Sequence, residues 1–589
     1  MSTKTLNRLL EWGVAHGVTL PEGIEFIYDD KKGICCVTTD EIQNPSIKVP
    51  ADIIISGKLA KEVFIDVTEH NSNTYLKFLL ARLMFDKNLE NNSKINDLAK
   101  KFGPYLNALP LVIDSPLIWN PVELMSLNNT NLGNSINEKL KTIYKEWYEI
   151  VKGSSEFDND NIINDLKIFK KYDTVSYNEI YDSILINVSS ENHPIWYSFS
   201  SFLWAHLVFI SRAFPEYVVN RDCLQSAVVL LPVVDLLNHD YNTKVEWLSD
   251  NGAFCYRNLN TVPAGVELNN NYGGKGNEEL LSGYGFVINN NLFDSVALKI
   301  KLPLEVIGTI LKEEPELKLP TLSEYTWFAF DSTISNGKIE DDKSLSNFKD
   351  GIIFFINTNN EDCLTPLIDL FSYLAKTSIE TWTQLRPQFE GLQMLRNALD
   401  HKLKSINIAK TLIGEELFEK YPVKQYRNDW AETYRNGQIQ ILNHSISTLK
   451  ELEKKWMASN KSKLLTMNKV LKYDPEFSKS ELSQLFEGQD QDDVVFESTF
   501  ELFTLWFLTK SKQDSFPQKY SWVKSQLEEF INLNDVDSEI SEDAQEFFNG
   551  VLHQNSKLSL EDVNRTIEFL KCNSFTRVSS LQETIIVRI

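Results

Sequence analysis

The sequence predicts an α+β protein: a β-domain split by a helical insertion and followed by a large all-helical C-terminal lobe. Three observations predict this class. Short β-branched segments separated by turn residues fill residues 22–56 and return over 225–300. Apolar residues at helical spacing fill the stretch between them, and helical patterns continue from about residue 301 to the end. At 589 residues the chain also exceeds what one hydrophobic core usually fills.

The elements before residue 195 follow from these patterns. Leu6, Leu9 and Leu10 share one face of a predicted N-terminal helix. The segments IEFIYDD, GICCVTTDEI and SIKVPADIIIS, between residues 24 and 56, are typical of strands. TYLKFLLARLMF at 74–85 and INEKLKTIYKEWYEIVK at 136–152 have helical periodicity and predict the insertion.

A further helix is predicted over 195–214, from the segment IWYSFSSFLWAHLVFISRAF. Pro215 ends it, and Arg212 lies in its last turn, where a cation offsets the helix dipole. Turn and strand patterns follow over 225–300, including VPAG at 262–265 and NNNYGGKGNEELLSGYGF at 269–286. We expect an N-terminal helix over 1–21, a core domain over 22–273 with its insertion at about 65–195, the end of that core at 274–300, a helical lobe over 301–470 and a helical extension over 471–589.

The net charge restricts the class of partner. The formal charge is 59 − 82 = −23, which argues against nucleic-acid binding, because phosphate contacts need a basic surface. An acidic surface suits a basic partner, although it also serves simply to keep a large protein in solution. No run approaches 18 apolar residues and the N-terminus has no apolar signal core, so no membrane association is expected.

Cysteine usage points to a reducing compartment. The six cysteines form no CxxC pair and no Cys/His cluster with zinc spacing. They are typical of reduced, mostly buried thiols in a protein of the cytoplasm, or of the nucleus.

One apolar run, VLLPVVDLLNHD at 229–240, carries polar residues that need an explanation. It is a buried strand or helical turn, or it is a site built around Asp235, Asn238 and His239. Asp235 and His239 have the spacing of a metal pair, but no third or fourth ligand presents itself, so we expect no metal. GGKG at 273–276 lacks the spacing of a phosphate-binding loop and indicates a flexible turn.

Four segments together carry a family resemblance: GIC at 33–35, SRAF at 211–214, DLLNH at 235–239, and NNNYGG with SGYGF between 269 and 286. With them the chain resembles the SET-domain protein-lysine methyltransferases, in the branch typified by the plant Rubisco large-subunit methyltransferase and shared with fungal enzymes that methylate translation proteins. PYLNALP (104–110), PLIWNPVELMSLNNTNLG (116–133) and AETYRNGQIQIL (431–442) are similar to further segments of that branch. The resemblance implies a SET β-fold, and the missing zinc-binding cysteine cluster fits a branch in which a helical lobe follows instead.

The resemblance also implies the cofactor and the site. The methyl donor would be S-adenosylmethionine. Tyr284 would be the catalytic tyrosine, and the substrate lysine would meet Arg212, Asp235 and Tyr284. The residues implied in cofactor binding are Gly33, Ile34, Arg212, Asn238, His239 and Tyr272. One position departs from the pattern, because Cys35 stands where the family usually has a second glycine next to the cofactor.

The function implied is methylation of a lysine on a non-histone protein, namely elongation factor 1-alpha or a ribosomal protein. Both substrates are basic and suit the acidic charge. Two alternatives stay open: a catalytically weak SET-like protein that docks a basic partner, which Cys35 motivates, and a methyltransferase for cytochrome c or a histone. We expect a cytoplasmic monomer, with the nucleus as the alternative location.

Overall fold

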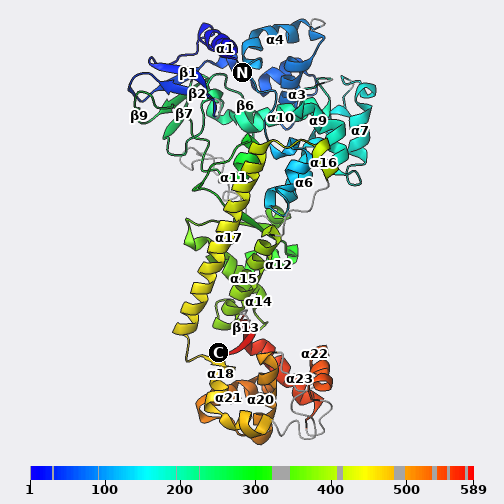
Figure 1. Ribbon diagram of the computed structural model, residues 1–589, viewed down its shortest axis with the longest axis vertical. Helices are drawn as coiled ribbons and strands as arrows, with labels where there is room; N and C mark the ends of the chain where they lie inside the picture. The colour runs from blue at the N-terminus through cyan, green and yellow to red at the C-terminus, as the bar shows by residue number, and fades with distance from the viewer. Residues whose placement is uncertain are drawn as a thin grey trace. The chain divides into compact units, whose positions relative to one another are not determined.

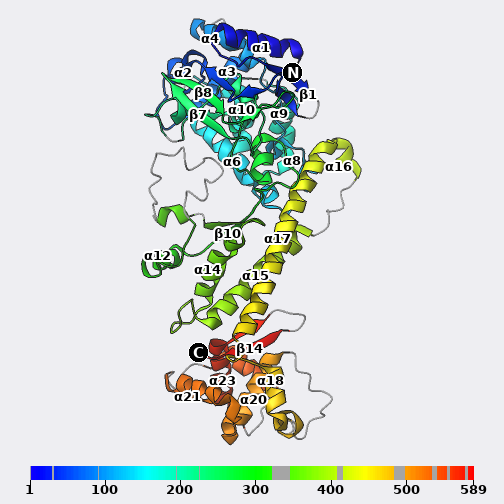
Figure 2. The same ribbon diagram turned by 90° about the vertical axis from the view of Figure 1, so that its left-hand side faces the viewer.

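The structure is a computed structural model that describes residues 2–29, 32–89, 92–154, 156–193, 195–224, 226–320, 345–349, 351–407, 415–482, 498–533, 540–552, 558–577 and 582–589. These residues form two compact units. Figures 1 and 2 colour the chain by residue number. Within the described ranges, the first unit contains 2–295 and 415–438, and the second contains 296–320, 345–407 and 439–589. Each has its own hydrophobic core, as expected for a chain of this length.

The strands of the first unit are short and pair antiparallel. They are β1 Ile24–Asp29, β2 Gly33–Thr38, β3 Ile42–Gln43, β4 Ser46–Val49, β5 Phe214–Pro215, β6 Val228–Val229, β7 Val245–Asp250, β8 Ala253–Asn258 and β9 Thr261–Val262. β4, β8 and β7 form a three-stranded sheet in that order, and β1–β2, β3–β9 and β5–β6 form pairs. An isolated parallel β-bridge between His239 and Asn270 connects two loops.

The helices of the first unit lie before, between and after these strands in the sequence. They are α1 Thr3–Ala15, α2 Gly57–Val63, α3 Ser72–Phe85, α4 Ser93–Leu106, α5 Pro121–Met125, α6 Asn131–Val151, α7 Ile163–Lys170, α8 Tyr177–Ile180, α9 Ile186–Ser189, α10 Phe199–Arg212, α11 Asn277–Glu279 and α16 Glu415–Lys420. Ser198 caps α10 by accepting a hydrogen bond from the Ser201 amide. α10 packs beside α3 (Figure 1), and Arg212 is its last residue, so the guanidinium projects where the helix ends.

The second unit is mostly helical. Its helices are α12 Leu304–Glu313, α14 Thr365–Ala375, α15 Leu385–Asn407, α18 Met467–Tyr473, α20 Thr499–Gln513, α21 Ser521–Leu533, α22 Glu542–Gly550 and α23 Leu560–Asn573. α17, Gln425–Ser459, begins in the first unit and ends in the second. α14 and α15 lie side by side (Figure 2).

The α+β class predicted from the sequence is confirmed, and three features differ from the expectation in detail. The helical C-terminal part also contains two small sheets, β10 Val296–Ile300 with β11 Ile352–Ile356, and β12 Leu464–Thr466, β14 Glu583–Val587 and β13 Ser574–Arg577 in that order. Their strands are too short to show a period, and β12 finds its partner β14 far along the chain.

The other two differences concern the region around the site. Within the expected strand-and-turn region, Leu280–Tyr284 instead forms a single π-helical turn, which Gly285 ends in the left-handed conformation (φ +74°). Residues 415–438 fall in the lobe expected over 301–470, but they pack on the first core through Ala431 and Tyr434.

Candidate active site

The larger cavity of the first unit has a volume of about 850 Å³. Its wall is built by segments far apart in the sequence: the start of β2, the loop at 110–114, the end of α10, the turn at 235–240 and the residues after the π-helical turn. All six residues for which the family resemblance implies cofactor contacts line it, namely Gly33, Ile34, Arg212, Asn238, His239 and Tyr272. The fold therefore brings together a set of residues that the sequence spreads over 240 positions.

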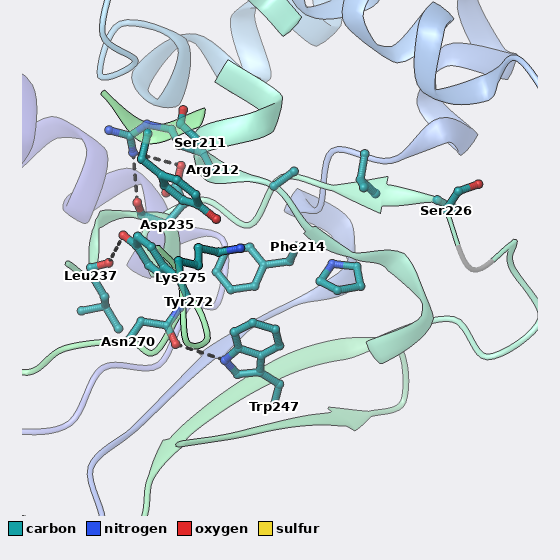
Figure 3. A pocket seen from close by; sticks show the side chains of 15 residues that line it. Ser211, Arg212, Phe214, Ser226, Asp235, Leu237, Trp247, Asn270, Tyr272 and Lys275 are labelled. Atoms are coloured by element: carbon teal, nitrogen blue, oxygen red, sulfur yellow. Dashed lines mark hydrogen bonds and ion pairs between the residues drawn. The ribbon is translucent and has the colours of Figure 1, made fainter. Parts of the chain in front are cut away.

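A second cavity of about 300 Å³, whose lining side chains Figure 3 shows, shares lining residues with the first. Aromatic side chains contribute much of its lining, including Phe214, Trp247 and Tyr272. Lys275 also lines it, with its ammonium 5.6 Å from the centre of the Tyr284 ring and paired with Glu279.

The two cavities share one wall. The residues that line both are Ser211, Arg212, Asp235, Tyr272 and Tyr284. A molecule in the larger cavity and a side chain in the smaller one would therefore meet at this wall, which is the arrangement needed to pass a small group from one to the other.

Arg212 is held at the wall by a buried carboxylate. Its Nη1 donates hydrogen bonds to the backbone oxygen of Asp235 at 3.0 Å and to Asp235 Oδ2 at 3.2 Å. Tyr105, from α4 of the insertion, donates to the same Oδ2 at 2.8 Å. Burying a charge pair is costly unless its hydrogen bonds are made, so these contacts fix the position of the guanidinium.

Asp235, for which the family resemblance implies contact with the substrate lysine, lines both cavities but is buried. None of its side chain is exposed, whereas 20% of the Arg212 side chain is. Asp235 Oδ2 accepts from Tyr105 and Arg212, whereas Oδ1 has no hydrogen-bond partner among the described residues. Arg212 is therefore positioned by Asp235 and is itself partly open to a ligand.

Asn238 links two segments that line the larger cavity. Its Nδ2 donates to the Ile34 backbone oxygen and to Glu267 Oε1, both at 2.8 Å. Glu267 Oε2 pairs in turn with Lys32 Nζ at 2.9 Å. The Asn238 amide thus fixes the start of β2 at the cavity wall, although the two bonded residues are 204 positions apart in the sequence.

Three stacked rings form the centre of the wall. His239 stacks on Tyr272 with ring centres 5.0 Å apart, and Tyr272 stacks on Tyr284 at 5.1 Å. The Tyr272 amide donates to His239 Nδ1 at 3.1 Å, and Tyr272 Oη donates to the Leu237 oxygen at 2.8 Å. Since Nδ1 accepts a hydrogen bond, the proton of the neutral ring is on Nε2.

Burial keeps these rings neutral. It lowers the pKa of His239 to about 4, although Asp240 opposes this shift. Burial, with Tyr272 and Glu279, raises the pKa of Tyr284 far above its usual range. The Tyr284 hydroxyl therefore stays protonated at neutral pH and acts as a hydrogen-bonding group, not as a phenolate base.

Cys35, the departure from the family pattern, does not occupy the cavity. Its side chain is buried in β2, and the lining residues from this segment are Lys32, Gly33 and Ile34. Burial raises the pKa of the Cys35 thiol to about 11, which keeps it unreactive. Gly33 has φ +77°, a conformation that glycine adopts without strain. The backbone at Gly33 can therefore still come close to a bound molecule, although Cys35 replaces the second glycine.

The apolar run at 229–240 has two uses. Its apolar residues are buried in the first core, while Asp235, Asn238 and His239 line the larger cavity. Val233 is forced to φ +75°, a strained conformation for a β-branched residue, directly before the turn that carries Asp235. The packing of the run therefore holds the polar residues in place.

Some site residues were not predicted from the sequence. Tyr105, Glu267, Trp247 and Lys275 carry no motif of their own, and only PYLNALP pointed to the neighbourhood of Tyr105. Among the described residues, no three His, Cys, Asp or Glu side chains gather as a metal site. In the same part of the chain, no helix is both long and apolar enough to cross a bilayer.

Comparisons with known proteins give the following similarities. A family model described as the EFM1 middle domain matches residues 331–460. The chain is 47% identical to Ribosomal lysine N-methyltransferase 1 of Saccharomyces cerevisiae, with 100% of each chain covered. It is 25% identical to Protein-lysine N-methyltransferase EFM1 of the same yeast, over 93% of this chain and 90% of that protein. A solved structure of Rubisco LSMT bound to AdoMet gives a TM-score of 0.48 at 16% identity, over 84% of this chain and 99% of that one.

The chain belongs to the SET-domain protein-lysine N-methyltransferases, in the branch that contains Ribosomal lysine N-methyltransferase 1. The enzyme class predicted from the motifs is confirmed. Enzymes of this class take their methyl group from S-adenosylmethionine.

The residues present fit that cofactor. The larger cavity is within the usual size range for a site that binds a small molecule. It offers a fixed guanidinium for a carboxylate in Arg212 and flat rings in Tyr272 and His239. Gly33 leaves the backbone open to close approach, because no atom lies within 4 Å of where a Cβ would stand.

Proposed function

We propose that this chain methylates a lysine of a ribosomal protein. The observation that carries the proposal is the full-length identity of 47% to Ribosomal lysine N-methyltransferase 1, against 25% to EFM1. The net charge of −23 supports a basic substrate, as ribosomal proteins are. The substrate would be methylated in the cytoplasm or the nucleus by a monomer of this enzyme.

The larger cavity holds the cofactor in this proposal. Arg212 would hold its carboxylate, the backbone of Gly33 and Ile34 would hold its amino-acid part, and His239 with Asn238 would hold its adenine. Bound S-adenosylmethionine supplies an electrophilic methyl group carried on a sulfonium. Asn238 is already committed to Ile34 and Glu267 through its side-chain amide, so its contribution is to position the pocket, and its backbone is left for the adenine.

The smaller cavity receives the substrate lysine. A free lysine has a pKa of ~10.4 and is mostly charged at neutral pH. Phe214, Trp247 and Tyr272 surround the entering side chain with apolar surface, which favours the neutral amine. The proton is released to solvent before the transfer, and the nitrogen lone pair then faces the common wall.

Tyr284 orients the amine at the wall. Its hydroxyl is protonated and makes no hydrogen bond with another described residue, so it is available to the amine. By accepting a hydrogen bond from an amine N–H, it aims the lone pair across the wall into the larger cavity. Tyr272, stacked on it at 5.1 Å, fixes the plane of the ring.

A methyl-transfer assay tests the substrate. Purified enzyme is incubated with radiolabelled S-adenosylmethionine and either the free ribosomal proteins or the elongation factor of the source organism. We expect label in one ribosomal protein, and mass spectrometry then identifies the lysine. Tyr284→Phe is the matched control, because it keeps the ring and removes only the hydroxyl.

An elongation factor is the second candidate substrate. The match of the EFM1 middle domain to residues 331–460 favours it. Label in the elongation factor and none in the ribosomal proteins would replace the first proposal with this one. Label in neither, above the Tyr284→Phe background, would contradict both.

A further inference from the structure

An unpaired group of cations stands on the second unit of this acidic chain. Lys469, Lys472 and Lys519 act on the exposed ring of Tyr473, and Lys461 lies beside Lys469. These five residues, here called the Tyr473 cluster, come from the turn before β12, from α18 and from the turn before α21. They belong neither to the cavities of the first unit nor to the core beneath them.

The geometry shows that the cations converge. Lys519 Nζ lies 3.6 Å from the centre of the Tyr473 ring, and Lys472 Nζ lies 5.5 Å from it. Lys469 Nζ donates to the backbone oxygens of Lys461 at 2.7 Å and Leu464 at 2.6 Å. The chain therefore holds Lys469 by its own carbonyls, close to the other lysines.

No carboxylate of the described residues forms an ion pair with these four lysines. The nearest acidic residue in the sequence, Asp474, faces the core and binds Trp506 and Lys510 instead. Burial, together with Lys461 and Lys519, lowers the pKa of Lys469. The pKa of Tyr473 is lowered by its hydrogen bond to Lys519 and by the positive charges of the neighbouring lysines. Like charges are thus held together without compensation, which costs free energy in the isolated protein.

An anionic partner would remove that cost. In a chain with a net charge of −23, a polyanion is repelled by most of the surface and attracted at such a cluster. Phosphates satisfy several lysines at once, and an exposed aromatic ring offers a face on which bases stack. A carboxylate peptide can use the lysines but gains nothing from the ring of Tyr473.

We propose that the Tyr473 cluster is a docking surface for the phosphate backbone of single-stranded RNA, by which the enzyme holds a substrate protein that is still associated with RNA. This deepens the proposed function and rests on its ribosomal substrate. It also revises the expectation of no nucleic-acid contact, which the net charge suggested. Net charge averages over the surface, while binding depends on the local field.

Fluorescence anisotropy with labelled RNA tests the docking surface on the full-length enzyme. The probe is a mixed-sequence single-stranded RNA, titrated at 50 and 200 mM salt. Four phosphate contacts predict a slope of log K against log salt of about −3, so binding should weaken about 50-fold between the two salt concentrations. Charge reversal of three lysines, K469E/K472E/K519E, should abolish measurable binding.

The control variant carries the same charge change elsewhere on the second unit. K450E/K454E/K455E alters three exposed lysines of α17 and should bind RNA as the unaltered enzyme does, apart from a small general repulsion. The milder K469Q/K472Q/K519Q should reduce the salt slope by about 2, which separates lost contacts from a folding defect.

Three results would overturn the proposal. These are no RNA binding at 50 mM salt, equal loss in the cluster and control variants, and tighter binding of a polyglutamate peptide than of RNA. Methylation of the free substrate protein by K469E/K472E/K519E is read separately and should be unchanged. The RNA-binding measurement therefore tests the docking surface, and the methylation assay separately tests the proposed function, so either one can fail while the other holds.

Discussion

Removing one hydroxyl in the insertion should change cofactor binding without touching the cofactor. Tyr105 is buried and donates to Asp235 Oδ2 at 2.8 Å. Tyr105→Phe keeps the ring packing and leaves Arg212 as the remaining side-chain partner of that oxygen among the described residues. A hydrogen bond to a charged group contributes about 1.5–3 kcal/mol, so the free energy of unfolding of the first unit should fall by about 2 kcal/mol.

The same change should loosen Arg212. Asp235 Oδ1 is already without a protein partner, so the carboxylate can turn once Tyr105 no longer holds Oδ2. If about 1 kcal/mol of the orientation of Arg212 is lost, the Kd of S-adenosylmethionine should rise about fivefold. Urea unfolding and isothermal titration calorimetry measure the two quantities.

Tyr144→Phe is the matched control. Tyr144 is equally buried, but its hydroxyl donates to the backbone oxygen of Asp165 at 2.7 Å, and it lines neither of the two site cavities. It should cost about 1 kcal/mol of stability and leave the Kd unchanged. If Tyr105→Phe gave the same stability loss and the same Kd as this control, the argument that Tyr105 positions Arg212 through Asp235 would be refuted.

Three further outcomes follow from the site and the core. Tyr284→Phe should lower kcat about 100-fold or more while the Kd of S-adenosylmethionine, measured by calorimetry, changes by less than about twofold; an unchanged kcat would remove Tyr284 from the mechanism. Asn238→Ala removes the bonds to Ile34 and Glu267 and should raise that Kd about tenfold, the effect of about 1.4 kcal/mol; no change would mean that β2 is held without Asn238. Burial lowers the pKa of His193 to about 4, below the ~6.5 of an unfolded histidine, so stability from its neutral form is complete above pH 6.5 and is lost as the pH falls toward 4. Between pH 7 and 5, urea unfolding should show the unaltered enzyme losing about 2 kcal/mol more than His193→Phe; equal losses would contradict the shift.

Local patterns were sufficient for most elements that carry the site. The apolar spacing in 195–214 predicted α10 and placed Arg212 in its last turn, as observed. GICCVT predicted the strand that begins at Gly33. These predictions succeed because helix and strand periodicity depend on neighbours a few residues apart.

Local patterns failed where distant contacts compete with them. The segment LLSGY was expected among strands and turns, yet it forms a π-helical turn. Gly285, which ends this turn, packs so closely that a Cβ added to it would stand 3.1 Å from the Asp114 backbone. The C-terminal ETIIV segment pairs with its neighbour β13 and also with β12, near residue 465, which is distant in the sequence. Neither contact leaves a periodic signal.

The sequence by itself determined the family, the α+β class and six residues that line the larger cavity, because these follow from short ordered motifs and from the alternation of apolar residues. Only the tertiary structure decided what each polar residue does. Asp235 was assigned to the lysine by resemblance, but it is buried between Arg212 and a tyrosine 130 positions earlier. Cys35, the one departure from the family motif, is buried away from the cavity. The physical reason is the same for both: burial and charge pairing depend on which distant segments meet, and a motif records only which residues are adjacent.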